Sequence, residues 1–134
     1  GRLGWAVRAH EDPSLLQERK NHLETLHQAL RGTLVARFAL AESLARKADS
    51  LPPLLRTWLS WWRDLALMAY GQRSNELISN VDEFELLHEL ADQVSRAVVR
   101  ASLVQTESAL RQLGQNANAR LVLENVLLTY PRQA

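Results

Sequence analysis

The sequence predicts an all-α fold, a compact bundle of about five or six helices. Apolar residues recur at helical spacing along the whole chain, and no sustained alternation of β-branched residues marks a strand. The breaks between the periodic segments fall at proline and glycine, which commonly stop helices. With 134 residues and no cysteine, the chain has the length of one domain that buries a core without disulfides.

A proline separates the first two predicted helices. The short apolar segment at residues 3–10 stops before Pro13, because proline biases the residue before it away from helical angles. A second helix is expected over residues 14–31, where apolar side chains form one stripe opposite charged ones. Gly32 is predicted to end it as a C-terminal cap.

The next two helices are separated by the clearest break in the chain, "ADSLPP". Before this break a helix is expected over residues 33–48, with Thr33 as its N-cap. After it a helix is expected over residues 53–70, because Pro53 suits a first turn and Gly71 suits the end. The apolar residues of the helix over residues 33–48 are Leu34, Val35, Phe38, Ala41, Leu44 and Ala45.

Three more helices are predicted in the last part of the chain. Asp82 is the expected N-cap of a helix over residues 83–93, and Ser95 or a neighbour interrupts the pattern before a longer helix. Gly114 closes that longer helix. Asn116 or Asn118 then caps a final helix, which Pro131 stops. The count is six helices, the first of them short.

The composition excludes several classes of function. The formal net charge is +1, so no strong attraction to phosphate is indicated. The five glycines form no phosphate-binding loop, the histidines lack the spacing of zinc ligands, and no nucleophile elbow occurs. We therefore expect no catalysis by this chain alone, no cofactor and no metal. No apolar run approaches the roughly 20 residues that span a bilayer, and a cytoplasmic location is expected.

The helix over residues 53–70 contains the stretch "WLSWWRDLALMAYG". On a helical wheel at 100° per residue, its polar residues gather within roughly 60° of Ser60, which leaves about two-thirds of the surface for burial. Trp58 and Trp62 lie nearly opposite Ser60, so they are expected in a core rather than in a ligand pocket. The predicted core residues are Leu55, Trp58, Trp62 and Leu65.

Other residues on the helical wheels are candidates for contact with another subunit. Trp61 and Met68 lie at the border of the apolar arc, where they either meet another subunit or close the edge of their own core. The pairs Arg63–Asp64 and Arg120–Glu124 either bridge to another helix or to an adjacent subunit, or they are solvated surface charges. Solvated surface charges contribute about 0–1 kcal/mol to the stability of the fold. The predicted interface residues are Trp61, Arg63, Asp64, Met68, Arg120 and Glu124.

Four stretches of the chain carry a resemblance to a known family. In order they are "GRLGWAVRAHEDP", "WLSWWRDLALMAYG", "ISNVDEFELL" and "NANARLVLENVLL". With this order and spacing the chain resembles the delta-prime subunits of the bacterial clamp loader, a part of DNA polymerase III. The most specific part is the combination of "WWRD" with the final Asn-x-Asn-x-Arg-Leu helix. In one departure, Ala119 stands where many relatives carry proline.

The resemblance implies an assembly role. Residues 1–12 would be the tail of an AAA+ lid domain, and residues 13–134 a helical collar (oligomerisation) domain. In that family the collar domains of five subunits pack in a ring, so the implied partners are the delta and gamma/tau subunits. The sliding clamp and primed DNA would be reached only through AAA+ domains that precede this segment, and no membrane is implied.

Two alternatives stay open at this point. The collar domain of a gamma/tau subunit has a similar architecture and differs in the ATP hydrolysis carried by its preceding domains. A helical regulatory domain that binds a small molecule could also use a tryptophan-lined interior, since such pockets are mostly apolar with a few polar groups.

Overall fold

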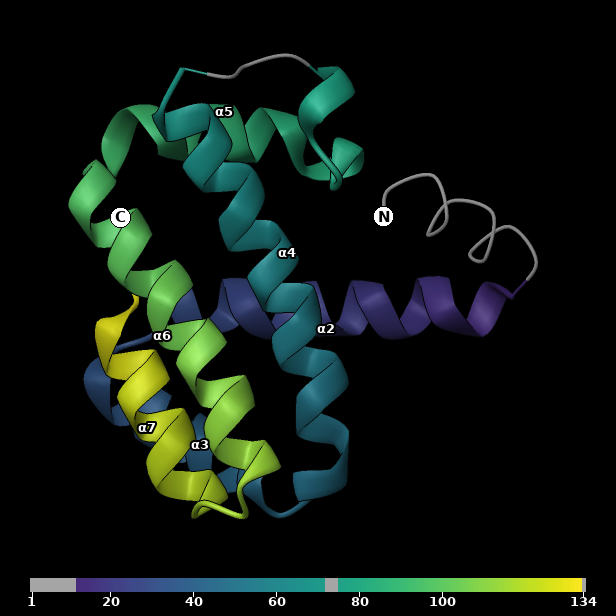
Figure 1. Cartoon of the computed structure of the whole chain (residues 1–134), viewed down its shortest axis with the longest axis vertical. Helices are drawn as coiled ribbons and strands as arrows, with labels where there is room; N and C mark the ends of the chain where they lie inside the picture. Colours follow the sequence, from purple (N-terminus) through teal and green to yellow (C-terminus); the bar gives the residue numbers. More distant parts are fainter. Residues whose placement is uncertain (1–11, 72–74, 134) are drawn as a thin grey trace.

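The computed structural model describes residues 12–71 and 75–133, and within these ranges every regular element is a helix (Figure 1). The all-α prediction is therefore confirmed. The predicted helix at residues 3–10 lies outside the described residues. Of the predicted lid-domain tail at residues 1–12, only Asp12 is described. The α-helices are α2 (Pro13–Arg31), α3 (Leu34–Ala45), α4 (Leu51–Ala69), α5 (Phe84–Gln93), α6 (Arg96–Gly114) and α7 (Ala119–Thr129), and the 3-10 helices are η1 (Ala48–Ser50), η2 (Asn75–Leu77) and η3 (Val81–Glu83).

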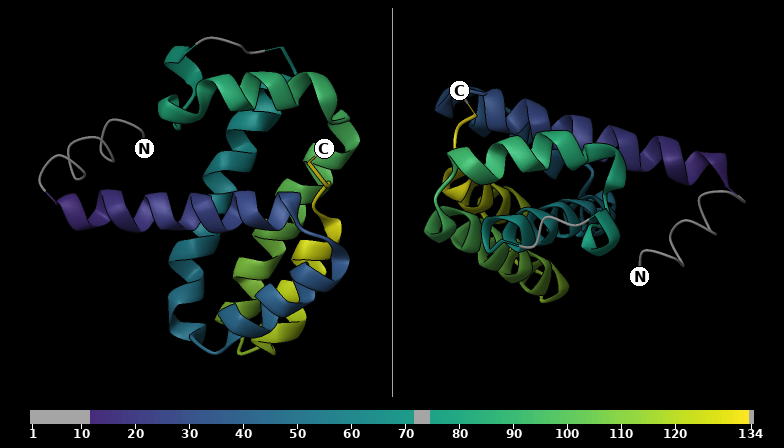
Figure 2. Two further views of the ribbon diagram at one scale, coloured as in Figure 1. Left: turned by 180° about the vertical axis from the view of Figure 1, so that it is seen from behind. Right: turned by 90° about the horizontal axis from the view of Figure 1, so that it is seen from above.

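Helix α4 is the centre of the arrangement. It packs against α2, α5 and α6, and Figures 1 and 2 show α2 crossing it while α6 runs alongside. Helix α7 packs against α6 on one side and α3 on the other, so α3 and α7 form an outer layer far from α5. This central position explains why the wheel of α4 is apolar over most of its circumference.

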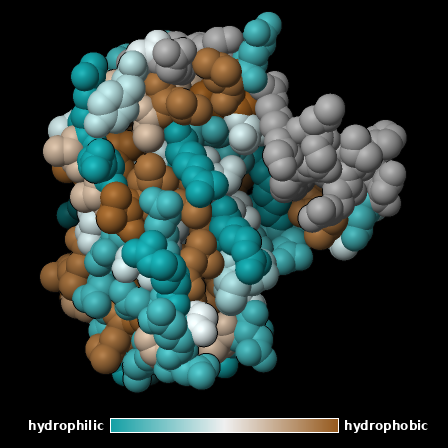
Figure 3. Space-filling model, in the orientation of Figure 1, coloured by the Kyte–Doolittle hydropathy of each residue, from teal (hydrophilic) through white to brown (hydrophobic). Residues whose placement is uncertain are grey.

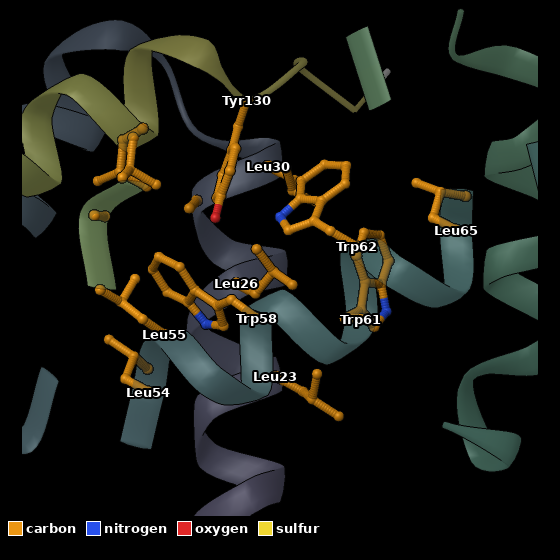
Figure 4. Packing of buried hydrophobic residues seen from close by; sticks show 14 of the residues in the cluster. Leu23, Leu26, Leu30, Leu54, Leu55, Trp58, Trp61, Trp62, Leu65 and Tyr130 are labelled. Atoms are coloured by element: carbon orange, nitrogen blue, oxygen red, sulfur yellow. The ribbon is translucent and has the colours of Figure 1, made fainter. Parts of the chain in front are cut away.

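The core is built around aromatic rings from α4 and from the end of α7 (Figure 4). The ring centroids of Trp62 and Tyr130 are 4.8 Å apart, and Trp61 meets Trp62 edge-on with 5.0 Å between centroids. The centroids of Trp58 and Tyr130 are 5.9 Å apart. Offset and edge-to-face pairs of this kind add to the stabilisation from burial alone. The Tyr130 hydroxyl is paired with that of Thr106 at 2.5 Å, so the ring is buried without an unpaired polar group.

Side-chain caps begin four of the helices. The predicted cap Thr33 accepts a hydrogen bond from the Ala36 amide at 3.2 Å, and Asn118 accepts one from Leu121 at 3.0 Å. These bonds satisfy amides that have no partner within the helix. Ser95 is an N-cap as well, which explains why the helical pattern breaks there. The Asp12 carboxylate caps α2, and the hydrogen bonds from Ser14 hold the pKa of Asp12 below its usual value.

One predicted cap is wrong, and two predicted glycine ends are confirmed. Asp82 does not cap α5, because η3 precedes this helix and no side chain caps it. Gly32 is the C-cap of α2, as predicted, and it adopts an extended conformation with φ −78°. Gly114 is the last residue of α6, as predicted, and the left-handed residue that follows is Asn116, with φ 59°; asparagine tolerates this region better than most residues.

Candidate assembly surface

Trp61 lies inside the domain. Its side chain is fully buried, as is that of Met68. The indole nitrogen of Trp61 donates to Glu83 Oε1 at 3.1 Å, and His27 packs edge-on against the same ring at 5.7 Å. A contact with another subunit through Trp61 and Met68 is therefore not possible in this fold, and the structure supports the alternative that Trp61 closes the edge of its own core.

Asp64 cannot contact another subunit either, because it is buried. Only 2% of it is exposed. Its carboxylate accepts hydrogen bonds from the Ser79 amide at 3.1 Å, from the Asn80 amide at 2.7 Å and from the Asn80 side chain at 2.7 Å. Three donors compensate the buried charge, so Asp64 anchors the segment before α5 to α4 instead of reaching a neighbour.

The same segment is tied to α2 by an arginine. Arg19 donates to both carboxylate oxygens of Asp82, at 2.8 and 2.9 Å, and to Asn80 Oδ1 at 2.7 Å. The hydrogen bond from Arg19 is the main reason that the pKa of Asp82 lies below its usual value. We call these four residues, Arg19, Asp64, Asn80 and Asp82, the loop latch, because together they join α2, α4 and the segment at residues 78–83.

Glu83 extends the connection to α2. Its Oε1 accepts from His27 Nε2 at 2.5 Å and from the Trp61 indole. The carboxylate and the imidazole are both mostly buried. Trp61 is thus covered by His27 of α2 and by Glu83 of η3. These contacts are the physical reason that Trp61 has no exposed surface.

Of the remaining predicted interface residues, Arg63 and Arg120 are exposed, whereas the Glu124 side chain is only 18% exposed. Arg63 is exposed on α4. Arg120 and Glu124 lie one turn apart on α7, with Arg120 Nε at 3.5 Å from Glu124 Oε1. The fold does not bring Arg63 close to the pair Arg120 and Glu124. Arg63 lies on the exposed side of α4, whereas α7 packs mainly against α3 and α6. The residues expected in the core, Leu55, Trp58, Trp62 and Leu65, are all buried.

Sequence reasoning missed Arg37, a buried arginine of α3 that is 7% exposed. Its guanidinium donates to Ala29 O at 2.9 Å, near the end of α2, and to the carbonyls of Leu127, Tyr130 and Pro131 at 2.7, 2.6 and 2.9 Å. These are carbonyls at or just beyond helix C-termini, where acceptors lack partners and the helix dipole is negative. Arg37 therefore clamps the ends of α2 and α7 to the start of α3.

Helices α3 and α7 carry five of the eleven large apolar side chains that are exposed among the described residues. Val35 is 78% exposed, Leu34 55% and Phe38 36% on α3, and Leu121 is 60% and Leu128 50% exposed on α7. We call these five residues the α3–α7 face. Hydrophobic side chains gather along the lower left edge of Figure 3, over α7. The two helices pack against each other, and large apolar side chains left exposed are often found at interaction surfaces.

The described residues provide no evident chemistry of another kind. Among them no group of three or more histidine, aspartate or glutamate side chains is placed to hold a metal ion. None of the described helices combines the length and the apolar character that crossing a membrane requires. The exposed apolar side chains of α3 and α7 remain as the candidate assembly surface.

Comparison with known proteins gives one match. Residues 13–131 match the family model described as DNA polymerase III, delta subunit, C terminal. No curated protein matches the chain, and no solved structure matches it. The family match covers all six described helices, from the first residue of α2 to two residues beyond the end of α7.

Proposed function

The chain belongs to the family of C-terminal domains of DNA polymerase III delta subunits, and on this premise we propose that it is the collar domain of a delta-prime subunit. It packs with the collar domains of the delta and gamma/tau subunits, so that the complete clamp loader can place the sliding clamp on primed DNA. In this proposal the clamp and the DNA are contacted only by AAA+ domains that precede the segment. The chain itself carries no catalytic residue.

The observation that carries the proposal is the combination of the family match with the α3–α7 face. A domain that fills its own core with all three tryptophans of α4 leaves no aromatic cluster for a ligand. It nevertheless exposes five large apolar side chains on two adjacent helices. Surfaces of this kind mark contacts with other proteins, as an assembly domain requires.

The choice of delta-prime rests on sequence stretches that build the structural framework. "WLSWWRDLALMAYG" covers the centre and end of α4, and "ISNVDEFELL" contains Asn80 and Asp82, the two loop-latch residues that bind Arg19 of α2. "NANARLVLENVLL" covers the Asn118 cap and α7 up to Leu128. They support delta-prime over the collar of a gamma/tau subunit, which stays the second candidate.

Reconstitution tests the proposal. The full-length subunit that contains this chain is mixed with delta and gamma/tau subunits from the same source, and complexes are isolated by size exclusion. We expect one stable complex that contains all three, and restoration of clamp loading only in mixtures that lack delta-prime. Restoration in mixtures that lack gamma/tau would favour the second candidate, and absence of any complex would refute the assembly role.

A separate assay tests the expectation that the chain is not an enzyme. The 134-residue chain is incubated with ATP and primed DNA, and phosphate release is measured. We expect no turnover above buffer. Robust hydrolysis that survives repeated purification would contradict the proposal.

A further inference from the structure

We propose that a second surface, formed by α4 and α6, docks an acidic helix of a neighbouring subunit. Its positive charge comes from five exposed arginines, which are Arg56 and Arg63 on α4 and Arg96, Arg100 and Arg111 on α6. We call these five residues the arginine face. The inference rests on the proposed function and deepens it, since a subunit in a ring meets its two neighbours through two different surfaces.

The period of each helix places its arginines in one row. Arg56 and Arg63 are seven residues apart, which is close to two turns of α4. On α6, Arg100 and Arg111 follow Arg96 by four and by fifteen residues. All three therefore lie within roughly 60° of one another on a wheel at 100° per residue. The residues that α6 buries occupy a different arc of this wheel, and they are Val99, Ser102, Thr106 and Ala109.

One contact joins the two rows. Arg96 Nε donates to the carbonyl of Ala69 at 3.0 Å, and the guanidinium lies over the Tyr70 ring, 5.1 Å from its centroid. Tyr70 comes seven residues after Arg63, so it extends the row of α4. The end of α4 thus meets the start of α6, and the two helices run alongside each other in opposite directions (Figures 1 and 2).

The other neighbours of α4 leave this side open. Figures 1 and 2 show α2 crossing α4 on the far side from the viewer of Figure 1. In Figure 3, which has the orientation of Figure 1, hydrophilic side chains extend down the middle of the molecule, over α4 and α6. The two rows of arginines therefore lie side by side on one exposed surface.

The charge of the arginine face is not neutralised within the domain. Among the described residues none of its five guanidinium groups forms an ion pair. Helices α4 and α6 contain two acidic residues, Asp64 and Glu107. Asp64 is buried and accepts hydrogen bonds from the segment before α5, whereas Glu107 lies in the row of α6. Five arginines beside these two carboxylates leave the face with a net positive charge.

Apolar side chains lie between the arginines. Leu67 is 38% exposed on α4 and Val104 is 47% exposed on α6. Each comes four residues after an arginine of its row, Arg63 or Arg100, and therefore lies one turn further along. A helix suits such a surface, because it buries apolar side chains and presents carboxylates at spacings of one or two turns. Arginine in turn binds a carboxylate through two parallel hydrogen bonds.

Helix α5 shows the pattern that a partner helix needs. Its exposed side carries Glu85, Glu89 and Asp92, spaced by four and by three residues. These carboxylates come directly before α6 and would repel the phosphates of a nucleic acid. An extended phosphate backbone also offers no apolar group to Leu67 or Val104. We therefore assign the arginine face to a helix with carboxylates at this spacing, on the delta or the gamma/tau subunit.

The assignment is tested by charge reversal in the full-length subunit. The face variant combines Arg63→Glu with Arg100→Glu, because neither side chain forms a hydrogen bond or an ion pair with a described residue. Arg96 is left unchanged, since it binds the end of α4. The control variant combines Lys20→Glu with Arg31→Glu, which makes the same change in net charge at exposed residues of α2. Circular dichroism checks that both variants are folded.

Each variant is titrated with delta and with gamma/tau at low and at moderate salt. We expect the face variant to bind one of these subunits roughly tenfold more weakly, or worse, at low salt. The loss should shrink at moderate salt, because salt screens exposed charges. The control variant should bind as the wild type does. Arg100→Gln should weaken binding about twofold to fivefold, and it decides the question if the face variant does not fold.

The outcomes separate the two proposals. If the wild-type subunit forms no complex, the proposed function fails and this inference fails with it. If the wild type assembles and the folded face variant assembles with equal affinity, only the assignment of the arginine face is overturned. Equal weakening by the face variant and the control variant would overturn it too, since the effect would then come from net charge alone.

Two measurements on the 134-residue chain test the other occupants. Fluorescence anisotropy with labelled primed DNA should show no binding, and sedimentation should show a monomer. DNA binding that the face variant abolishes would overturn the assignment in favour of a nucleic acid. An oligomer that the face variant disperses would overturn it in favour of a second copy, which would supply its own α5.

Discussion

The guanidinium of Arg37 donates to the backbone carbonyl of Tyr130 at 2.6 Å, across 93 positions of the sequence. Tyr130 is at the same time the ring on which Trp58 and Trp62 pack. The outer layer of α3 and α7 is therefore coupled to the aromatic core of α4 through one residue. Burial lowers the pKa of Arg37, yet an arginine stays protonated in proteins, so the clamp carries a positive charge at neutral pH.

Replacing Arg37 should cost a large part of the stability of the domain. Arg37→Met keeps much of the side-chain length but leaves carbonyls at two helix ends without their donor. We expect a loss of about 3 kcal/mol in the free energy of unfolding, measured by urea denaturation. Arg37→Lys should recover a part of this, because an ammonium group satisfies fewer of these acceptors. A loss below about 0.5 kcal/mol for Arg37→Met would show that the clamp is dispensable.

Replacing Asp64 should loosen the segment before α5. Asp64→Ala removes the acceptor of three hydrogen bonds, and two of the donors are backbone amides. We expect a loss of about 2 to 3 kcal/mol, together with faster amide hydrogen exchange at Ser79 and Asn80. A double-mutant cycle with Asn80→Ala should be strongly non-additive, because the two residues contact each other. Additive losses would contradict the loop latch.

Trp61→Ala should destabilise the domain by itself, without any partner present. The ring is fully buried between α2, Trp62 and Glu83, and truncation of a buried tryptophan costs about 3 to 5 kcal/mol. Trp61→Phe should cost less, because it keeps a ring and loses the bond to Glu83. The control is Leu67→Ala, at an exposed position. An unchanged melting temperature for Trp61→Ala would reopen the possibility of a contact with another subunit.

The ion pair of Arg19 and Asp82 predicts a specific dependence on pH. The pKa of Asp82 is lower in the folded state, mainly through the hydrogen bond from Arg19. The pair therefore stabilises the fold above the unfolded aspartate pKa of 3.8, and this contribution is lost as the pH falls through the lower folded value. The effect is expected to be small, because the Asp82 side chain is 63% exposed.

The measurement is urea denaturation of the wild type and of Asp82→Asn at several pH values from neutral to acidic. The wild type should lose more stability than Asp82→Asn once the pH drops below the ordinary range of aspartate. Above that range the difference between the two should be constant. Equal acid-induced losses in both proteins would mean that the pair contributes nothing at Asp82.

Residues with a local role in a helix could be predicted before the fold was known. Thr33 was predicted as a cap and is one, because capping depends on a side chain and an amide three residues apart. The buried arc of α4 could also be predicted from its period. Asp82 shows the limit, since aspartate before a helix suits a cap locally but pairs instead with Arg19, 63 positions earlier.

The exposed apolar residues of α3 could not be identified from the helical period of the sequence alone. The helix carrying Leu34, Val35, Phe38 and Ala41 is apolar almost throughout, so its period does not say which residues face the core. The fold buries Ala41 and the charged Arg37 and exposes the larger side chains. A charged residue is buried here because two distant helix ends supply its acceptors, and no local rule brings those ends together.

By itself the sequence determined that the chain is all helix, where most of the helices start and stop, and that Trp58 and Trp62 lie in a core. These properties depend on period, capping and proline or glycine breaks, which act over one or two helical turns. Only the tertiary structure decided that Trp61 and Asp64 are buried, that Arg37 clamps α2 and α7, and that α3 and α7 present the apolar face. Those outcomes depend on which helices become neighbours, and residues as far apart as Arg37 and Tyr130 meet only after the whole chain has packed.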